Sequence, residues 1–212
     1  MSQKQKKIVQ VSYAIYYILL VLAAVYCYHT QKEGLMMGAV ALFTCFLVPL
    51  VLKILHLTPI FEIYMINIIF AAIASIAGSM LGAYSFPFFD KVLHFCSGLF
   101  LSELSYMVFC WLKKTTVIKE KNERILSIIF VNACNMMIAV FWEFFEYGCL
   151  IFLNNDAINH YTSGVHDSMT DMLVAFVGGM IITCFILSYY KNDKKNFWIK
   201  LNEHFYDINF NS

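Results

Sequence analysis

The sequence predicts an all-α integral membrane protein, built as a bundle of six transmembrane helices. Two observations support this: the 212 residues are 60% hydrophobic and only 14% charged, and the mean hydropathy is +0.67. A soluble domain would carry about a quarter charged residues. The apolar residues also come in long blocks instead of alternating with polar ones, which is typical of membrane spans.

A membrane-spanning helix needs about 20 predominantly apolar residues. Six segments meet this requirement, and they are residues 8–28, 35–55, 63–84, 91–112, 125–152 and 169–190. Residues 1–190 are therefore predicted to form a single membrane domain, followed by a polar tail over residues 191–212. In that tail Trp198, Leu201 and Phe205 share a helical face, so the tail forms either a short helix at the membrane surface or a frayed end.

The basic residues predict the orientation and the location. Of the 15 Lys and Arg residues, all except Lys32 and Lys91 fall on the side of the bilayer that holds both chain ends. Loops rich in Lys and Arg stay in the cytoplasm, so both termini are expected to be cytoplasmic and the protein to lie in the cell membrane among its lipids. The net charge of +1 gives no reason to expect a nucleic-acid partner.

Three of the predicted spans carry ionisable residues at one depth. His94, Glu143 and Asp171 each lie nineteen or twenty residues from the basic residue that marks the cytoplasmic end of the same span. At a helical rise of about 1.5 Å per residue this is about 28–30 Å, close to the thickness of the hydrocarbon core. These residues are therefore expected at the outer edge of the bilayer.

Within each segment, the spacing places polar side chains in pairs. Asp90 precedes His94 by four residues and Glu143 precedes Glu146 by three, so each pair lies on a single helix face. Helices that each offer two ligands to a shared centre are typical of carboxylate-bridged metal sites in bundles. Glu143 and Glu146 are also the candidate catalytic acids. The candidate metal ligands are Asp90, His94, Glu143, Glu146, His166, Asp167 and Asp171.

The charge balance of these residues predicts a bound cation or shared protons. The only fixed cation near the five carboxylates is Lys91, which directly follows Asp90 and is expected to point elsewhere on its helix. Clustered acids without a counter-charge are unstable at a lipid boundary. Either one or two divalent cations neutralise them, or several share protons. Imidazole with carboxylates suits Zn²⁺, Mn²⁺ or Fe, whereas carboxylates and water alone suit Mg²⁺ or Ca²⁺, so the expected cofactor is a divalent ion such as Zn or Mn.

Helix capping is the alternative explanation for part of this set. Acids near a helix N-terminus bind free N–H groups and suit the helix dipole, which would account for Asp90, Asp167 and Asp171. Capping does not account for Glu143 and Glu146, because they lie toward the C-terminal end of their span, where the dipole disfavours negative charge. Simple exposure at the membrane surface is the alternative for those two.

The same segments resemble a family of bacterial multipass membrane proteins, the YjdF-like proteins or DUF2238 family. The resemblance covers roughly residues 60–185, whereas the first two spans match only in being hydrophobic. A looser similarity links the first segment to the DK…H element of VanZ-like membrane proteins. His166 departs from the family's pattern, in which an aromatic residue precedes the aspartate, so its role as ligand or neighbour stays open. The resemblance rests on Asp90, Lys91, His94, Gly98, Trp142, Glu143, Glu146, Tyr147, Asp167, Asp171, Gly178 and Gly179.

Three functions fit these residues. The first is a metal-dependent hydrolase that acts on a lipid headgroup or an envelope precursor at the outer leaflet, since a bound metal activates water. The second is a cation- or proton-coupled transporter, although such sites usually lie at the midplane between repeats. The third is a scaffold whose metal only holds three helices together. Glu103, in mid-span and nearly opposite His94, has no predicted role, and no oligomeric state is predicted.

Overall fold

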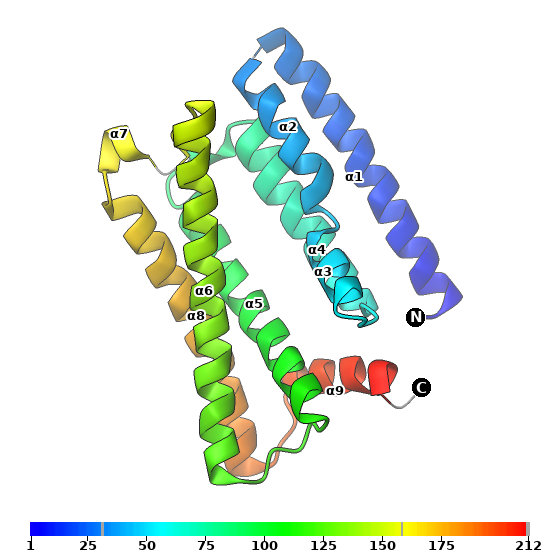
Figure 1. The fold of residues 1–212 in the computed structure, drawn as a ribbon. Coiled ribbons are helices and arrows are strands. Elements are labelled where there is room, and N and C mark those ends of the chain that lie inside the picture. The colour runs from blue at the N-terminus through cyan, green and yellow to red at the C-terminus, as the bar shows by residue number, and fades with distance from the viewer. Residues whose placement is uncertain (31, 158, 211–212) are drawn as a thin grey trace. The chain divides into compact units, whose positions relative to one another are not determined.

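The described part of the computed structural model, residues 1–30, 32–157 and 159–210, is helical and contains no strand (Figure 1). This confirms the predicted all-α class. The elements in chain order are α1 (Gln3–Thr30), α2 (Lys32–Thr44), α3 (Leu47–Ile54), α4 (Phe61–Ala71), the π-helical η1 (Ala72–Met80), the 3₁₀-helical η2 (Ala83–Ser85), α5 (Phe89–Lys113), α6 (Lys121–Leu153), α7 (His160–Ser163), α8 (His166–Asn192) and α9 (Phe197–Phe210).

Six helical segments of the described residues are long and apolar enough to cross a membrane. They correspond one to one with the predicted spans, with ends that differ by a few residues. The third span ends earlier than predicted, at Met80, because the chain turns there through Gly82, whose φ of +80° suits glycine. The six segments are Gln3–Thr30, Gly34–Ile54, Phe61–Met80, Phe89–Lys113, Lys121–Leu153 and His166–Asn192.

The second span is interrupted between α2 and α3. Pro49 causes this break, because its ring would clash with the carbonyl group of Cys45, four residues earlier, in a continuous helix. The carbonyl groups freed by the break are satisfied by side chains of other helices. The Asn67 amide donates to the carbonyl oxygens of Thr44, at 3.1 Å, and of Cys45, so the break costs no unpaired backbone group in an apolar setting.

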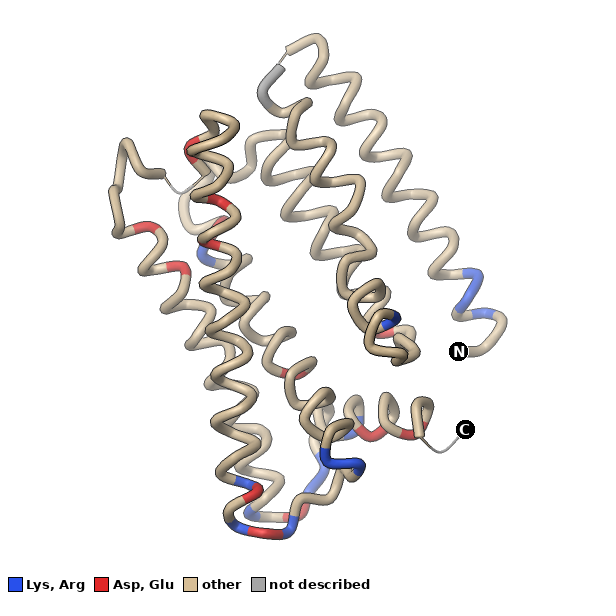
Figure 2. The backbone as a smooth tube through the Cα atoms, in the orientation of Figure 1, with Lys and Arg blue, Asp and Glu red and all other residues tan. Residues whose placement is uncertain are grey.

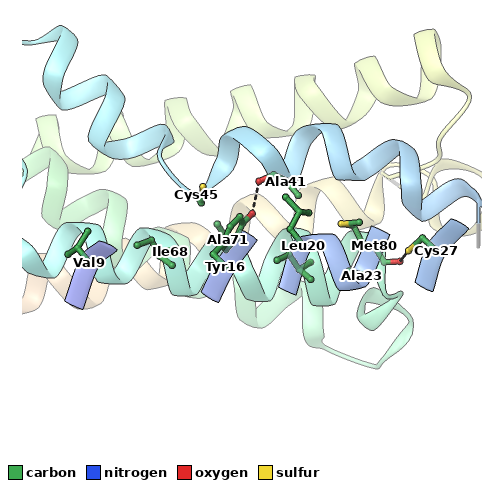
Figure 3. Packing of buried hydrophobic residues seen from close by; sticks show 11 residues of the cluster. Val9, Tyr16, Leu20, Ala23, Cys27, Ala41, Cys45, Ile68, Ala71 and Met80 are labelled. Carbon is green, nitrogen blue, oxygen red and sulfur yellow. Dashed lines mark hydrogen bonds between the residues drawn. The ribbon is translucent and has the colours of Figure 1, made fainter. Parts of the chain in front are cut away.

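The chain divides into two compact units, Met1–Phe89 with the described residues from Ile208, and Asp90–Asp207. In the first unit, buried side chains of α1 pack against α2, α4 and η1 (Figure 3). Side chains of α1 also donate hydrogen bonds to backbone carbonyls of neighbouring spans. The Tyr16 hydroxyl donates to the Ala41 oxygen at 2.6 Å, and the Cys27 thiol donates to the Met80 oxygen at 3.2 Å.

In the second unit, α5, α6 and α8 pack around a common core, which the first turns of α9 also join. The core is formed by Tyr106, Cys110, Val131, Ile182, Ile186, Tyr189 and Ile199. In α9 the buried residues are Ile199, Leu201, Asn202 and Phe205. The last two residues of the predicted tail, 211 and 212, lie outside the described residues.

Helices α5 and α8 approach each other closely because small residues line their contact. A Cβ atom on Gly98 would lie 2.0 Å from the Ala175 carbonyl oxygen, and one on Gly178 would lie 2.3 Å from the Phe95 carbonyl oxygen. Neither distance leaves room for a methyl group. In lipid, where apolar burial gives little drive for association, such backbone contacts are a main source of helix packing.

Replacing Gly98 with alanine should therefore destabilise the second unit. We expect Gly98→Ala to lower the free energy of unfolding by about 2 kcal/mol, because α5 and α8 must separate to admit the methyl group. The matched control is Gly148→Ala in α6, whose Cβ would meet only Phe152 at 3.9 Å and which should be neutral or slightly stabilising. Thermal unfolding of both variants in detergent tests this; equal unfolding temperatures would contradict the close contact.

Candidate functional site

The candidate site is built where α5 and α8 begin, beside the second half of α6, and it lies wholly within the second unit. Asp90 lies in the first turn of α5 and Asp167 in the first turn of α8. A negative charge there is stabilised by the helix dipole. In Figure 2, acidic residues gather at this end of α6 and α8, whereas the basic residues of the second unit gather mainly at the opposite end.

Lys91 lies in the centre of the acidic residues, so the prediction that it points away from them is wrong. Its Nζ atom is 2.6 Å from Oδ1 of Asp167 and 2.7 Å from Oδ1 of Asp171. It is also 3.4 Å from Oδ2 of Asp90. Lys91 is rotated by about 100° from Asp90 around the axis of α5. Helix α8 packs against the surface of α5 between these two residues, so both side chains lie next to it. The sequence gives the angle between Asp90 and Lys91, but it does not show against which side of α5 helix α8 packs.

His94 and two aspartates bring three ligand atoms together. The Nε2 atom of His94 is 3.4 Å from Oδ1 of Asp90 and 3.9 Å from Oδ1 of Asp171. One ligand atom from each of these three residues lies within 4.8 Å of the other two. His94 and Asp171 are buried, with exposed fractions of 8% and 1%. The predicted pair on α5 therefore meets Asp171, one of the candidate ligands on α8.

Asp167 is held by partners on both of its carboxylate oxygens. Oδ1 accepts from Lys91, and Oδ2 accepts from the Nδ2 group of Asn159 at 2.6 Å. Asn159 has a φ of +50°, a left-handed conformation that asparagine tolerates better than most residues. Asn159 is not among the candidate residues predicted from the sequence. The only signal is its position among turn-forming residues before α7, which predicts a loop rather than a contact.

Glu143 is buried beside this group without a partner. Its exposed fraction is 6%, and neither carboxylate oxygen forms a hydrogen bond with a described residue. The carboxyl group is close enough to His94 and Asp90 to interact with them electrostatically, and the Ser168 hydroxyl lies near it but outside hydrogen-bond geometry. A buried carboxylate is costly unless it is paired or protonated, so a cation or a proton would stabilise Glu143.

The two remaining candidates lie at the edge of the site. Glu146 is half-buried, accepts a hydrogen bond from Nε1 of Trp142 at 2.7 Å, and interacts electrostatically with His94. His166 is exposed and is not among the residues whose ligand atoms converge. The structure thus brings Asp90, His94 and Asp171 together, with Glu143 and Glu146 next to them. Asp167 instead contacts Lys91 and Asn159.

The three converging side chains fit one divalent ion. Metal–ligand bonds of about 2.0–2.2 Å place the ligand atoms of one ion roughly 3–4 Å apart, and the two distances from His94 Nε2 fall in this range. One imidazole nitrogen and two carboxylate oxygens suit Zn²⁺ or Mn²⁺.

The comparison with known families agrees with the fold. The model of the family described as "Predicted membrane protein (DUF2238)" matches residues 10–192. The chain belongs to this family. The match begins in the first span, so the relationship extends beyond the region from about residue 60 that the sequence motifs indicated. With six candidate spans, this DUF2238 member is a multipass membrane protein. No curated protein and no solved structure matches the chain.

Removing Asp171 should weaken the contact between α5 and α8. We expect Asp171→Ala to reduce the free energy of unfolding by about 3 kcal/mol, because it leaves Lys91 and His94 partly unpaired in a buried setting. The control is His166→Ala, which removes an exposed side chain five residues earlier and should change stability by less than about 0.5 kcal/mol. Thermal unfolding in detergent measures both, and similar unfolding temperatures would show that the ion pairs contribute little.

Proposed function

We propose that this membrane protein binds one divalent metal ion through Asp90, His94 and Asp171 and uses it in a hydrolytic reaction. The observation that carries this proposal is the convergence of one imidazole nitrogen and two carboxylate oxygens within 4.8 Å. The substrate class that fits is a lipid headgroup or an envelope precursor, because such molecules present a phosphoryl or carbonyl group at the edge of the bilayer.

Glu143 is the residue best placed to act as general base. Both of its oxygens are buried and lack a hydrogen-bond partner among the described residues, so they are free to accept a proton. A bound metal polarises the substrate and makes a bound water more acidic. Glu143 would accept the proton of that water, while Trp142 orients Glu146 at the edge of the site.

The alternative of a transporter has less support from the packing. Gly98 lies one turn beyond His94 in α5, and Ala175 lies one turn beyond Asp171 in α8. At this level the two backbones are in such close contact that a single added methyl group would not fit. A transported ion that left the site toward the middle of the bilayer would have no space between these two helices.

The proposed orientation places both termini in the cytoplasm and the site near the outer face of a bacterial inner membrane. The positive-inside rule supports this. Apart from Lys91, the basic residues of the second unit lie where α5 ends and α6 begins, in the loop between them, at the end of α8 and in the segment after it (Figure 2).

Reporter fusions test the orientation. A green fluorescent protein fused to the C-terminus should fluoresce, because it folds in the cytoplasm but not after export through the general secretory route. Alkaline phosphatase inserted at Ser163, in the connection between α6 and α8, should be active because it needs the oxidising outer compartment. The reverse pair of results would place the site at the cytoplasmic face and would contradict an outer-leaflet substrate.

Metal content tests the proposed centre directly. We expect protein purified in detergent and dialysed against Zn²⁺ or Mn²⁺ to retain about one equivalent, and His94→Ala to lose it, because removal of a ligand typically weakens binding by at least tenfold. His166→Ala is the matched control and should retain the metal. Elemental analysis measures all three.

Two results would contradict the metal centre. The first is that folded wild-type protein retains no metal at all. The second is that the His94→Ala and His166→Ala variants lose the same fraction of it. Either result would leave proton sharing among the carboxylates as the explanation of the acidic residues.

A further inference from the structure

The acidic residues of the site already bind a cation, the side-chain ammonium of Lys91. It contacts Oδ1 of both Asp167 and Asp171 at 2.6–2.7 Å, which is the distance of a strong charge-assisted hydrogen bond. Among the described residues no other Lys or Arg forms an ion pair with these carboxylates. The site is therefore partly neutralised by a cation that belongs to the chain.

Lys91 and the proposed metal share one ligand atom. Oδ1 of Asp171 is the oxygen that contacts Lys91 Nζ, and the same oxygen lies 3.9 Å from Nε2 of His94. A metal ion bound between His94 and this oxygen would lie within a few ångströms of the ammonium group. Two cations at such a separation repel each other strongly where little water screens them, so metal binding and the contact between Lys91 and Asp171 oppose each other.

We propose that Lys91 is a tethered competitor that determines the affinity and the charge selectivity of the site: it excludes monovalent cations and is displaced from Asp171 by divalent ones. This inference rests on the proposed metal centre, whose ligands it shares. It assigns Lys91 a positioning and selectivity role rather than a catalytic one.

The selectivity follows from charge and tethering. A free Na⁺ or K⁺ that displaced the ammonium group would exchange one positive charge for another and gain no electrostatic energy. Lys91 also has an advantage over any free ion, because a tethered group acts at a high effective concentration. A divalent ion that replaces the ammonium group adds one further positive charge to a site with several carboxylates. Glu143, which is buried and has no hydrogen-bond partner among the described residues, gains a counter-charge as well.

Asp167 can still bind the ammonium group of Lys91 after this group has left Asp171. Its Oδ1 already contacts Nζ, and its Oδ2 is fixed by Asn159. When a metal takes Oδ1 of Asp171, the ammonium group can keep its bond to Asp167 and move away from the metal. The side chain of Lys91 is 25% exposed, so it has access to the space that this movement needs.

Mn²⁺ binding to three proteins tests the inference. Wild type, Lys91→Met and Lys91→Arg are purified in detergent, and free Mn²⁺ is titrated by electron paramagnetic resonance at low and high NaCl. We expect Lys91→Met to bind Mn²⁺ about tenfold more tightly than wild type, because a competing charge is removed. Its affinity should fall steeply as Na⁺ is added, since Na⁺ can now enter the site. Lys91→Arg keeps the charge and should behave like the wild type.

The outcomes separate the two proposals. If wild type binds Mn²⁺ and Lys91→Met binds it equally or more weakly, the competitor role is wrong and the metal centre stands. If neither wild type nor Lys91→Met binds Mn²⁺, the metal centre itself is wrong and the inference falls with it. If wild type does not bind while Lys91→Met does, both are supported and the competition is stronger than expected.

A measurement on the wild-type protein avoids any folding defect of the variants. Reaction of lysine amines with an acetylating reagent is followed at Lys91 by mass spectrometry, with and without Mn²⁺, and Lys195 serves as the internal reference because it lies outside the site. Metal binding should increase the acetylation of Lys91, because the amine loses one of its carboxylate partners. Unchanged or reduced acetylation at saturating Mn²⁺ would overturn the inference.

Discussion

The ion pairs of Lys91 with Asp167 and Asp171 are the interaction on which the arrangement of the second unit depends. They join the first turns of α5 and α8 at the end of the bundle where the acids gather. Charges near the hydrocarbon core are costly unless they are paired, so this contact fixes which faces of the two helices meet. Once those faces meet, His94 and Asp171 must lie close together, and the ligand atoms of the candidate centre converge.

The close contact of α5 with α8 makes this geometry possible. Gly98 and Ala175 follow the polar residues by one helical turn, and only residues of this size allow the backbones to touch. Larger residues would force the two helices apart and lengthen the ion pairs between them. The small residues and the charged residues therefore act together. The small residues determine how closely the helices approach, and the charged residues determine how the helices are rotated about their axes.

Polar side chains also lie between α6 and α8, farther along α8 than the acids. Asn135 of α6 donates to the Ala175 carbonyl oxygen at 3.0 Å, and Asn132 donates to the Thr183 hydroxyl at 2.8 Å. Such bonds between membrane helices are worth about 0.5–2 kcal/mol each, so they stabilise the pairing of α6 with α8. Glu103 is not part of the candidate centre. Its exposed fraction is 3%, and neither of its carboxylate oxygens has a hydrogen-bond partner in the described part of the chain.

The sequence by itself determined the helical class, the six candidate spans and the end of each helix at which the acids lie, because these follow from apolar length and a constant rise per residue. It also determined which residues share a face of one helix, such as Asp90 with His94. Only the tertiary structure decided which faces of different helices meet. For that reason Lys91, expected to point away, lies among the acids, Asn159 holds Asp167, and His166 is exposed. A single helix fixes angles around its own axis, whereas contacts between helices depend on packing that local sequence does not encode.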